Sequence, residues 1–300
     1  MTLSPSRVAA LRARADIVNC IRSFFTGRGY LEVETPLRIP APAPEAHIDA
    51  ITSEDWFLQT SPEICMKRLL AAGIPKLFQI SRCWRRDERG RRHFPEFTML
   101  EWYEAGSDYR GLMQTTQDLV RSVAPTGGLA FSGETIDLEG DFERLTVRDS
   151  FRRYGRMPME EAERHDLFDE IMVVDIEPRL GCGRPTFLYD YPANRSALAR
   201  LKSDDPSVAE RFELYIGGIE LANGFSELTD ADEQRERFVA EEEFRRSQGK
   251  RPYPLPERFL ADLPSMPPAA GIALGVDRLV MVLLDKGSVD DVVAFTPEEL

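Results

Sequence analysis

Six arginines lie within one short stretch of a 300-residue chain whose formal net charge is −13. They are Arg82, Arg85, Arg86, Arg89, Arg91 and Arg92. Guanidinium groups form paired hydrogen bonds with phosphate oxygens, so this cluster in an acidic chain could bind a compact polyanion such as a nucleoside triphosphate. A solvated loop would carry the same residues, and the composition alone leaves both interpretations open.

Three glutamates, Glu213, Glu220 and Glu227, recur at intervals of seven residues and could hold a divalent cation. Side chains alternate along a regular strand, so an odd interval places neighbours on opposite faces unless a bulge or turn intervenes. Gly217 and Gly218 in the first interval and Gly224 in the second would allow such a bulge or turn. Carboxylates brought together repel each other, and Mg²⁺ suits their oxygens and would relieve the repulsion. An edge strand with exposed glutamates is the alternative, although flanking apolar residues argue against full exposure.

A single arginine, Arg278, stands near the start of an apolar segment, GIALGVDRLVMVLL, which predicts a glycine-containing entry to a helix. The helix dipole disfavours a cation there, so Arg278 calls for an anionic partner such as phosphate. Upstream, TSPEICMKRLLAAG predicts a helix with Ser61 as its cap, Pro62 at its first position and Glu63 in its first turn. The Glu63 carboxylate would favour the helix dipole whether or not it contacts a ligand.

The elements that position these residues are both strands and helices. The segments LFQISRCW and FTMLEWY, within residues 77–103, predict two strands joined by the arginine-rich loop. A helix is expected to begin after Ser4 and to end at Gly27, with the strand-like YLEVETP following it. Further helices are predicted over 109–123, 145–155, 160–172 and 230–250, and further strands over 56–59 and 187–192.

The composition excludes several classes of protein. A hydrophobic content of 42% can bury a large core. The four cysteines form no CxxC pair, so neither a zinc site nor a disulfide framework is predicted, and a reducing cytoplasm is the expected location. We expect no signal peptide and no membrane span. The acidic balance argues against nonspecific binding of nucleic acid.

Three segments together resemble the three motifs of the class II aminoacyl-tRNA synthetases. GRGYLEVETPL is similar to motif 1, the loop RRDERGRRHFPEF to motif 2, and GIALGVDR to motif 3. The segments HFPEFTMLEWY and GGIELANGFSELTD resemble the lysyl branch of that family. Ala273 stands where lysyl-tRNA synthetases usually have glycine, as it does in the smaller elongation factor P lysine ligases, which the chain resembles most.

This resemblance implies an α+β fold in which an antiparallel sheet flanked by helices forms a single class II catalytic domain over residues 1–300. A lysyl-tRNA synthetase carries an anticodon-binding domain before motif 1. This sequence reaches motif 1 almost at once, so no such domain is expected and tRNA is not an expected partner. In the family, the motif 1 helix and strand form the dimer interface, which implies a homodimer.

The resemblance also assigns roles to individual residues, with Arg85 and Arg278 as the catalytic pair. Residues that would bind ATP are Arg85, Arg86, Asp87, His93, Phe94, Phe97, Glu220, Leu221, Gly275 and Arg278. Residues that would bind the amino acid are Ser61, Pro62, Glu63, Glu101, Tyr103, Glu227 and Ala273. The Mg²⁺ that accompanies ATP would lie on Glu213 and Glu220, and Glu227 would meet the lysine ε-ammonium.

The implied reaction is activation of lysine or (R)-β-lysine by ATP, followed by transfer to a lysine side chain of elongation factor P. Asp87 and Phe94 depart from the family pattern, which more often has Glu and Asn there, but neither change removes a required charge. A truncated lysyl-tRNA synthetase or another class II amidating ligase would use a different acceptor. A noncatalytic paralogue would bind without turnover, although such a paralogue would be expected to lose the motif arginines or metal glutamates.

Overall fold

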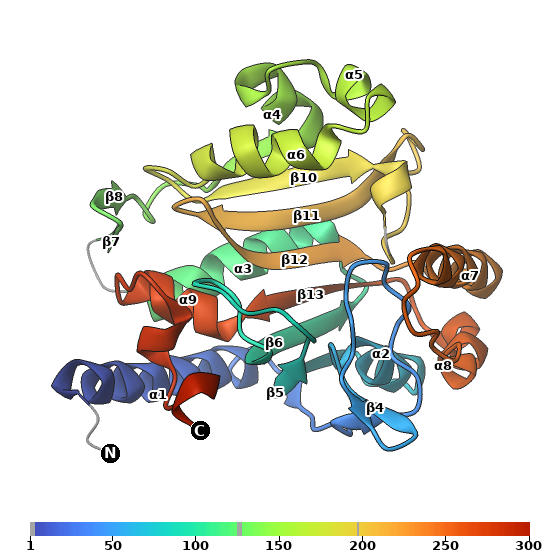
Figure 1. The fold of residues 1–300 in the computed structure, drawn as a ribbon, viewed down its shortest axis with the longest axis horizontal. Helices are drawn as coiled ribbons and strands as arrows, with labels where there is room; N and C mark the ends of the chain where they lie inside the picture. Colours follow the sequence, from blue (N-terminus) through green and yellow to red (C-terminus); the bar gives the residue numbers. More distant parts are fainter. Residues whose placement is uncertain (1–3, 125–127, 197) are drawn as a thin grey trace.

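An eight-stranded sheet forms the centre of the computed structural model, which describes residues 4–124, 128–196 and 198–300 (Figure 1). The strands, in sheet order, are β1 (Leu31–Glu32), β5 (Lys76–Trp84), β6 (Glu96–Ala105), β13 (Ala269–Gly275), β12 (Ile219–Ser226), β11 (Val208–Ile216), β10 (Thr186–Pro192) and β9 (Glu143–Thr146). The strands from β5 to β10 pair antiparallel, whereas β1 and β9 join the two edges in parallel. The expected α+β class is confirmed.

Helices cover the sheet and extend its ends. They are α1 (Pro5–Thr26), α2 (Glu63–Ala71), α3 (Tyr109–Val123), α4 (Val147–Tyr154), α5 (Met159–Arg164), α6 (Phe168–Ile171), α7 (Ala231–Ser247), α8 (Glu257–Asp262) and α9 (Val276–Leu283). Figure 1 shows α4, α5 and α6 gathered beside the β10 edge, and α7 and α8 side by side at the right-hand end of the strands. Within the described residues, no helix has the length and apolar character needed to span a bilayer.

Two smaller sheets accompany the large one. The first joins β2 (Arg38–Ile39), β4 (Trp56–Leu58) and β3 (Thr52–Ser53), and the second joins β7 (Leu129–Phe131) and β8 (Glu134–Ile136). The predicted strand over 56–59 therefore exists, but it belongs to a small sheet separate from the main one. The predicted strand over 30–36 pairs only at β1.

The alternation of side chains along β6 separates the core from the site. Leu100 and Trp102 are fully buried in the main hydrophobic cluster, where Trp102 packs against Phe25 of α1 with ring centroids 5.0 Å apart. Glu101 and Tyr103 alternate with them and therefore face the other side of the sheet. One strand thus supplies both apolar packing and polar chemistry.

Several predicted helix boundaries are confirmed, but the predicted cap of α2 is wrong, and the single helix predicted over 160–172 is divided into α5 and α6. Helix α1 begins after Ser4, whose hydroxyl accepts a hydrogen bond from the Arg7 amide at 3.2 Å. Helix α2 begins at Glu63, so Pro62 and not Ser61 occupies the cap position, although the Ser61 hydroxyl still accepts from the Glu63 amide at 3.0 Å. The predicted glycine-containing entry GIALG lies in β13, and the apolar helix α9 follows it at Val276, with Arg278 near its start as predicted.

A hairpin joins β11 to β12 and explains the glutamate spacing. Gly217 and Gly218 form its turn with φ angles of 57° and 71°, which glycine adopts without a steric penalty. The register then shifts, because Leu214 pairs with Ala222 while Tyr215 pairs with Glu220. Leu221 is therefore the extra residue of a bulge. The predicted irregularity exists, but its extra residue is a leucine rather than a glycine.

Candidate active site

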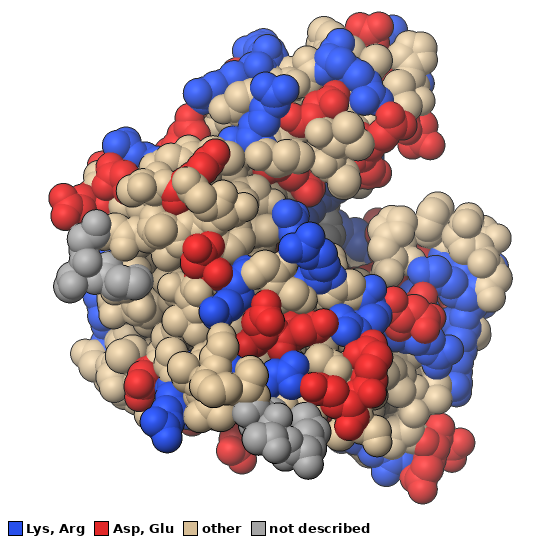
Figure 2. Space-filling model, turned by 60° about the vertical axis from the view of Figure 1, so that its left-hand side comes forward, with Lys and Arg blue, Asp and Glu red and all other residues tan. Residues whose placement is uncertain are grey.

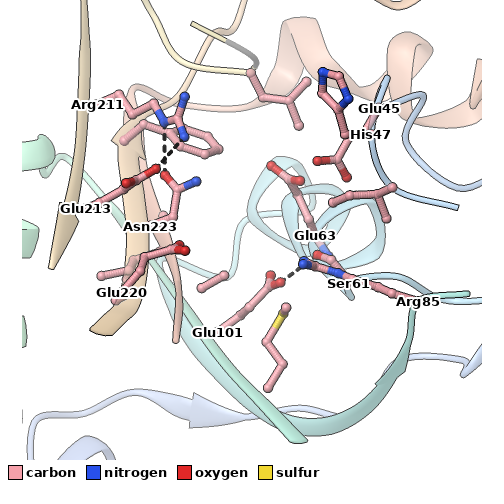
Figure 3. Close-up of a pocket in the computed structure, with 18 of the residues that line it drawn as sticks. Glu45, His47, Ser61, Glu63, Arg85, Glu101, Arg211, Glu213, Glu220 and Asn223 are labelled. Carbon is pink, nitrogen blue, oxygen red and sulfur yellow. Dashed lines mark hydrogen bonds and ion pairs between the residues drawn. The ribbon is translucent and has the colours of Figure 1, made fainter. Parts of the chain in front are cut away.

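A cavity of about 920 Å³ opens over one face of the sheet. Side chains from β6, β12 and β13 line it, together with the arginine-rich loop after β5, residues 44–48, residues 193–196 and helix α7. The surface is deeply hollowed below the lobe that α4, α5 and α6 form (Figure 2). Figure 3 shows Glu213, Glu220 and Asn223 on one side of the cavity and Glu63 on the other.

One end of the cavity is built around the carboxylate of Glu101. The Ser61 hydroxyl donates to its Oε1 at 2.5 Å, and the Tyr103 hydroxyl donates to its Oε2 at 2.7 Å. Glu101 is almost fully buried, and burial together with the nearby Glu63 carboxylate raises its pKa to about 8. Both hydroxyls therefore contact a carboxyl group whose pKa is about 8 and not in the usual acidic range.

A buried ammonium completes this end. Lys67 lies between two carboxylates, with its Nζ 2.5 Å from Glu63 Oε1 and 2.5 Å from Glu227 Oε2. Burial disfavours the charged form of Lys67, but the Glu227 and Glu63 carboxylates outweigh it and raise its pKa to about 12. The chain thus places its own lysine beside the residues predicted to receive a substrate lysine. We name this end, formed by Ser61, Glu63, Lys67, Glu101, Tyr103 and Glu227, the ammonium end.

The second oxygen of Glu227 is buried and has no hydrogen-bond donor among the described residues. Burial is the main cause that raises the pKa of Glu227 to about 8, with Lys67 acting in the opposite direction. A Cβ atom on Gly271 would lie 2.5 Å from this oxygen and 2.2 Å from the Tyr103 ring. Only glycine at 271 therefore permits this close packing.

The opposite wall carries Glu213 in a ring of donors. The hydroxyls of Tyr191 and Tyr215 donate to its Oε2 at 2.6 and 2.7 Å, and Arg211 donates to its Oε1 at 2.7 Å. Burial and the Glu213 charge together raise the pKa of both tyrosines far above the ordinary value. Glu213 is consequently a fixed carboxylate in a rigid setting.

Glu220 lies near Glu213 and is held by Arg278. One guanidinium nitrogen of Arg278 lies 3.3 Å from the Glu220 carboxylate and 2.9 Å from the Glu220 carbonyl oxygen. Burial and repulsion from Glu213 raise the pKa of Glu220, and Arg278 partly offsets this. Arg278 also contacts His93 at 2.6 Å, and burial beside this arginine lowers the pKa of His93. The position of Arg278 near a helix start predicts an anionic partner, and in this structure that partner is Glu220.

Arg85 faces the cavity with spare donors. Its guanidinium carbon lies 5.2 Å from the centre of the Phe97 ring, and its nearest carboxylate is Glu88 at 3.9 Å. The Nε of Arg85 is buried and has no hydrogen-bond partner among the described residues. A buried donor without a partner is costly, so this arginine is suited to a carboxylate or phosphate ligand. We name this second end, formed by Arg85, His93, Glu213, Glu220 and Arg278, the phosphate end.

The two wall glutamates fit a magnesium ion that is shared with phosphates. Among the described residues, no group of three or more His, Cys, Asp or Glu side chains could hold a metal ion alone. Mg²⁺ is usually bound through one or two carboxylates, with substrate phosphates and water completing its octahedron. Glu213 and Glu220 supply that number. Their mutual repulsion raises the pKa of Glu220, and a bound cation would relieve this repulsion.

Most of the predicted site residues meet in this cavity. Those that line it are Ser61, Glu63, Arg85, His93, Phe94, Phe97, Glu101, Tyr103, Glu213, Glu220, Leu221, Ala273, Gly275 and Arg278. Those that do not line it are Pro62, Arg86, Asp87 and Glu227. Of these four, Glu227 belongs to the ammonium end, where it contacts Lys67 behind the cavity wall. The Arg86 amide donates to the Asp49 carbonyl at 2.7 Å, which ties the arginine-rich loop to residues 44–49.

Sequence reasoning missed several residues of the cavity. Arg211 and Asn223 flank the predicted glutamates on β11 and β12, and Arg211 bonds to both Asn223 and Glu213. Their signal was adjacency to those glutamates. Lys67 is buried behind the cavity wall and was also missed, although it follows Glu63 by one helical turn, a spacing that favours ion pairs. Glu45, in a proline-rich segment, gave no signal at all.

Comparison with known families decides the assignment. The family model described as tRNA synthetases class II (D, K and N) matches residues 2–299. This chain belongs to that family. The antiparallel sheet is therefore that of a class II synthetase fold, and the chain is an enzyme of the ATP-dependent ligase class.

Several relatives within the family match almost the whole chain. A protein of Pectobacterium atrosepticum is 40% identical over 97% of this chain and 96% of its own length. A protein of Proteus mirabilis is 40% identical and one of Erwinia tasmaniensis is 41% identical, each over 96% of this chain and 95% of its own length. All three are named elongation factor P–(R)-β-lysine ligase.

Proposed function

We propose that this protein activates lysine or (R)-β-lysine with Mg-ATP and transfers it to a lysine side chain of elongation factor P. The observation that carries the proposal is the cavity itself, which brings the carboxylates of Glu63 and Glu101 together with the guanidinium groups of Arg85 and Arg278. A diamino acid has ammonium groups for the first end and a carboxylate for the second. ATP brings the phosphates that the arginines suit.

The proposed chemistry needs orientation and charge neutralisation rather than a protein nucleophile. Arg85 would hold the α-phosphate and the substrate carboxylate at the point where they react. Arg278 would hold the outer phosphates after leaving Glu220, and Phe97 would stack on adenine. Mg²⁺ would neutralise the triphosphate when bound to Glu213 and Glu220. The products of this step are an aminoacyl-adenylate and pyrophosphate.

At the ammonium end, Glu101 and Tyr103 would receive the side-chain ammonium of the substrate together with the free oxygen of Glu227. An ammonium buried without partners is costly, and these oxygens supply them. Glu63 would face the second amino group, with Ser61 ordering Glu101. Ala273 pairs with Glu101 across β13 and β6, so its methyl group borders the space where the two lysine isomers differ.

The names of the relatives support elongation factor P as the acceptor, since these proteins match the present chain over nearly its whole length. A homodimer through α1 and β1, a single catalytic domain and a cytoplasmic location remain part of the proposal. A tRNA acceptor is the second candidate, because the family model is that of tRNA synthetases.

Mass spectrometry of purified elongation factor P tests this proposal. The factor is incubated with the protein, Mg-ATP and either α-lysine or (R)-β-lysine. We expect one added residue on a single lysine, more with the β isomer, and no adduct with Arg278→Ala. The matched control is Arg82→Ala, since Arg82 is exposed on β5 and does not line the cavity.

Three other outcomes would redirect the proposal. Pyrophosphate exchange that depends on lysine, without an adduct on the factor, would retain adenylate formation but require another acceptor. Labelling of tRNA under the same conditions would favour the second candidate. Failure of both exchange and transfer would identify a binding protein without turnover.

A further inference from the structure

The cavity extends beyond the residues assigned to ATP and lysine. It is also lined by residues of the segment after β10 and of α7, among them Ala193, Asn194, Leu198, Gln234 and Glu241. Its volume of about 920 Å³ is near the upper end of the range of about 300–1,000 Å³ that ligand pockets span. This second region leaves room for a group that approaches the adenylate from outside.

Glu45 stands where the two regions meet. Figure 3 shows it on the same side of the cavity as Glu63 and across from Glu213. The nearby charged groups include Arg85 and Glu63, which are among the residues assigned to ATP and lysine. They also include Glu241 of α7 and Arg211 of β11. Glu45 is therefore close both to the arginine predicted to hold the reacting carboxylate and to the unassigned region.

The backbone around Glu45 is fixed by α7. The fully buried Arg245 donates to the carbonyl oxygens of Glu45 at 2.8 Å and Ile48 at 2.9 Å. Glu241 accepts a hydrogen bond from the Ala46 amide at 2.8 Å. A loop held at several points in this way presents its side chain in a defined place, as a reacting group requires.

The Glu45 carboxylate itself has no hydrogen bond or ion pair among the described residues. Burial is the main cause that raises its pKa to about 7, with Glu63 and Glu241 adding to the shift and Arg85 and Arg211 opposing it. A general base is most effective when it titrates near the working pH. The oxygens of Glu45 are free to accept a proton, whereas those of Glu213 already accept hydrogen bonds from three donors.

We propose that Glu45 is the general base for transfer of the aminoacyl group to the acceptor amine. The inference rests on the proposed function, since it concerns the second step of that reaction. The acceptor lysine would enter through the region beside α7 and would lose its first proton to solvent there. Its neutral amine would then attack the carbonyl carbon of the adenylate.

In this step the new N–C bond forms and the C–O bond to the phosphate breaks. One proton passes from the attacking nitrogen to the Glu45 carboxylate, and AMP departs with the electron pair of the broken bond. Glu45 afterwards returns the proton to solvent. No oxidant, reductant or further reactant is required.

The test measures adenylate formation and aminoacyl transfer separately in the variant Glu45→Gln. We expect lysine-dependent pyrophosphate exchange within about twofold of the parent protein, because adenylate formation does not use the base. Transfer from preformed adenylate to elongation factor P should fall by about 100-fold or more at pH 7, in line with the usual contribution of a general base. Glu45→Asp should retain part of the activity, and Glu54→Gln, an exposed carboxylate on the neighbouring small sheet, serves as control.

The pH profile and a second acceptor complete the test. The transfer rate of the parent protein should rise more steeply up to a pH of about 7 than that of Glu45→Gln, which should keep only the rise that comes from deprotonation of the acceptor amine. Equal losses in exchange and transfer would overturn the inference and place Glu45 at the amino-acid site, and equal activity in both would leave it without a role. If elongation factor P is not an acceptor at all, Nα-acetyl-lysine amide replaces it, and the same ratio between variant and parent protein is expected.

Discussion

The two ends of the cavity differ in the positive charge that accompanies their carboxylates. At the ammonium end, Glu63 and Glu227 share the ammonium of Lys67, and hydroxyl groups hold Glu101. At the phosphate end, arginines are already present, and Arg278 lies against Glu220. The first end needs additional positive charge to ionise fully. The second holds both charges in contact before any ligand is bound.

This difference indicates how each end would respond to its ligand. A substrate ammonium would displace protons from the ammonium end, where two glutamates have a pKa of about 8. A nucleotide with Mg²⁺ would instead require an exchange of partners, since Arg278 must leave Glu220 for phosphate while the metal replaces it. Under the proposed function, one end would respond to its ligand by proton loss and the other by ion-pair exchange.

The largest effect is expected at the phosphate end. Arg85→Ala removes the guanidinium that would stabilise charge at the reacting centre, and removal of such a group typically costs about 100- to 1,000-fold in rate. We expect a loss of this size in lysine-dependent pyrophosphate exchange, measured beside Arg82→Ala. If exchange falls by less than tenfold, the reacting carboxylate lies elsewhere.

A smaller effect is expected at the ammonium end. Glu101→Gln keeps the shape of the side chain but removes its charge, and a hydrogen bond to a charged group contributes about 1.5–3 kcal/mol, or about 10- to 100-fold. The KM for lysine in pyrophosphate exchange should rise by that factor, with kcat little changed. A fall in kcat at constant KM would contradict the division of roles between the ends.

The protonation of the ammonium end leads to a pH prediction. Because the pKa of Glu101 is raised to about 8, its neutral form predominates below that pH in the free protein, and the ionised form is the one that binds an ammonium. Lysine affinity should therefore fall by up to about tenfold per pH unit as the pH drops below 8. Calorimetry in buffers of different ionisation enthalpy should show proton release on lysine binding, and proton uptake would refute the assignment.

The smallest effect concerns a single hydroxyl group. Tyr103→Phe removes the donor to Glu101 while keeping the ring that packs against Gly271. A hydrogen bond contributes about 1 kcal/mol, which corresponds to about a fivefold rise in the KM for lysine. The thermal midpoint measured in parallel should change little, and a large drop would show that this hydroxyl serves the fold more than the substrate.

Much of the fold could be predicted from local patterns in the sequence. Ser4 and Pro5 marked the start of α1, and the boundaries of α3 agree with the predicted range 109–123. The two strands around the arginine-rich loop pair along their length as β5 and β6. These features depend on short-range capping and alternation, which a sequence displays directly.

The amino-acid sequence alone determined which residue types serve the site, because arginines, glutamates and glycines in a characteristic order identify the family and its motifs. Only the tertiary structure decided how they are paired. The bulge at Leu221 and the turn at Gly217 set the face of Glu220, and the packing of α2 places Lys67 between Glu63 and Glu227. Glu45 reaches the cavity because a buried arginine from α7 holds its loop, a contact across about 200 residues that no local pattern reveals.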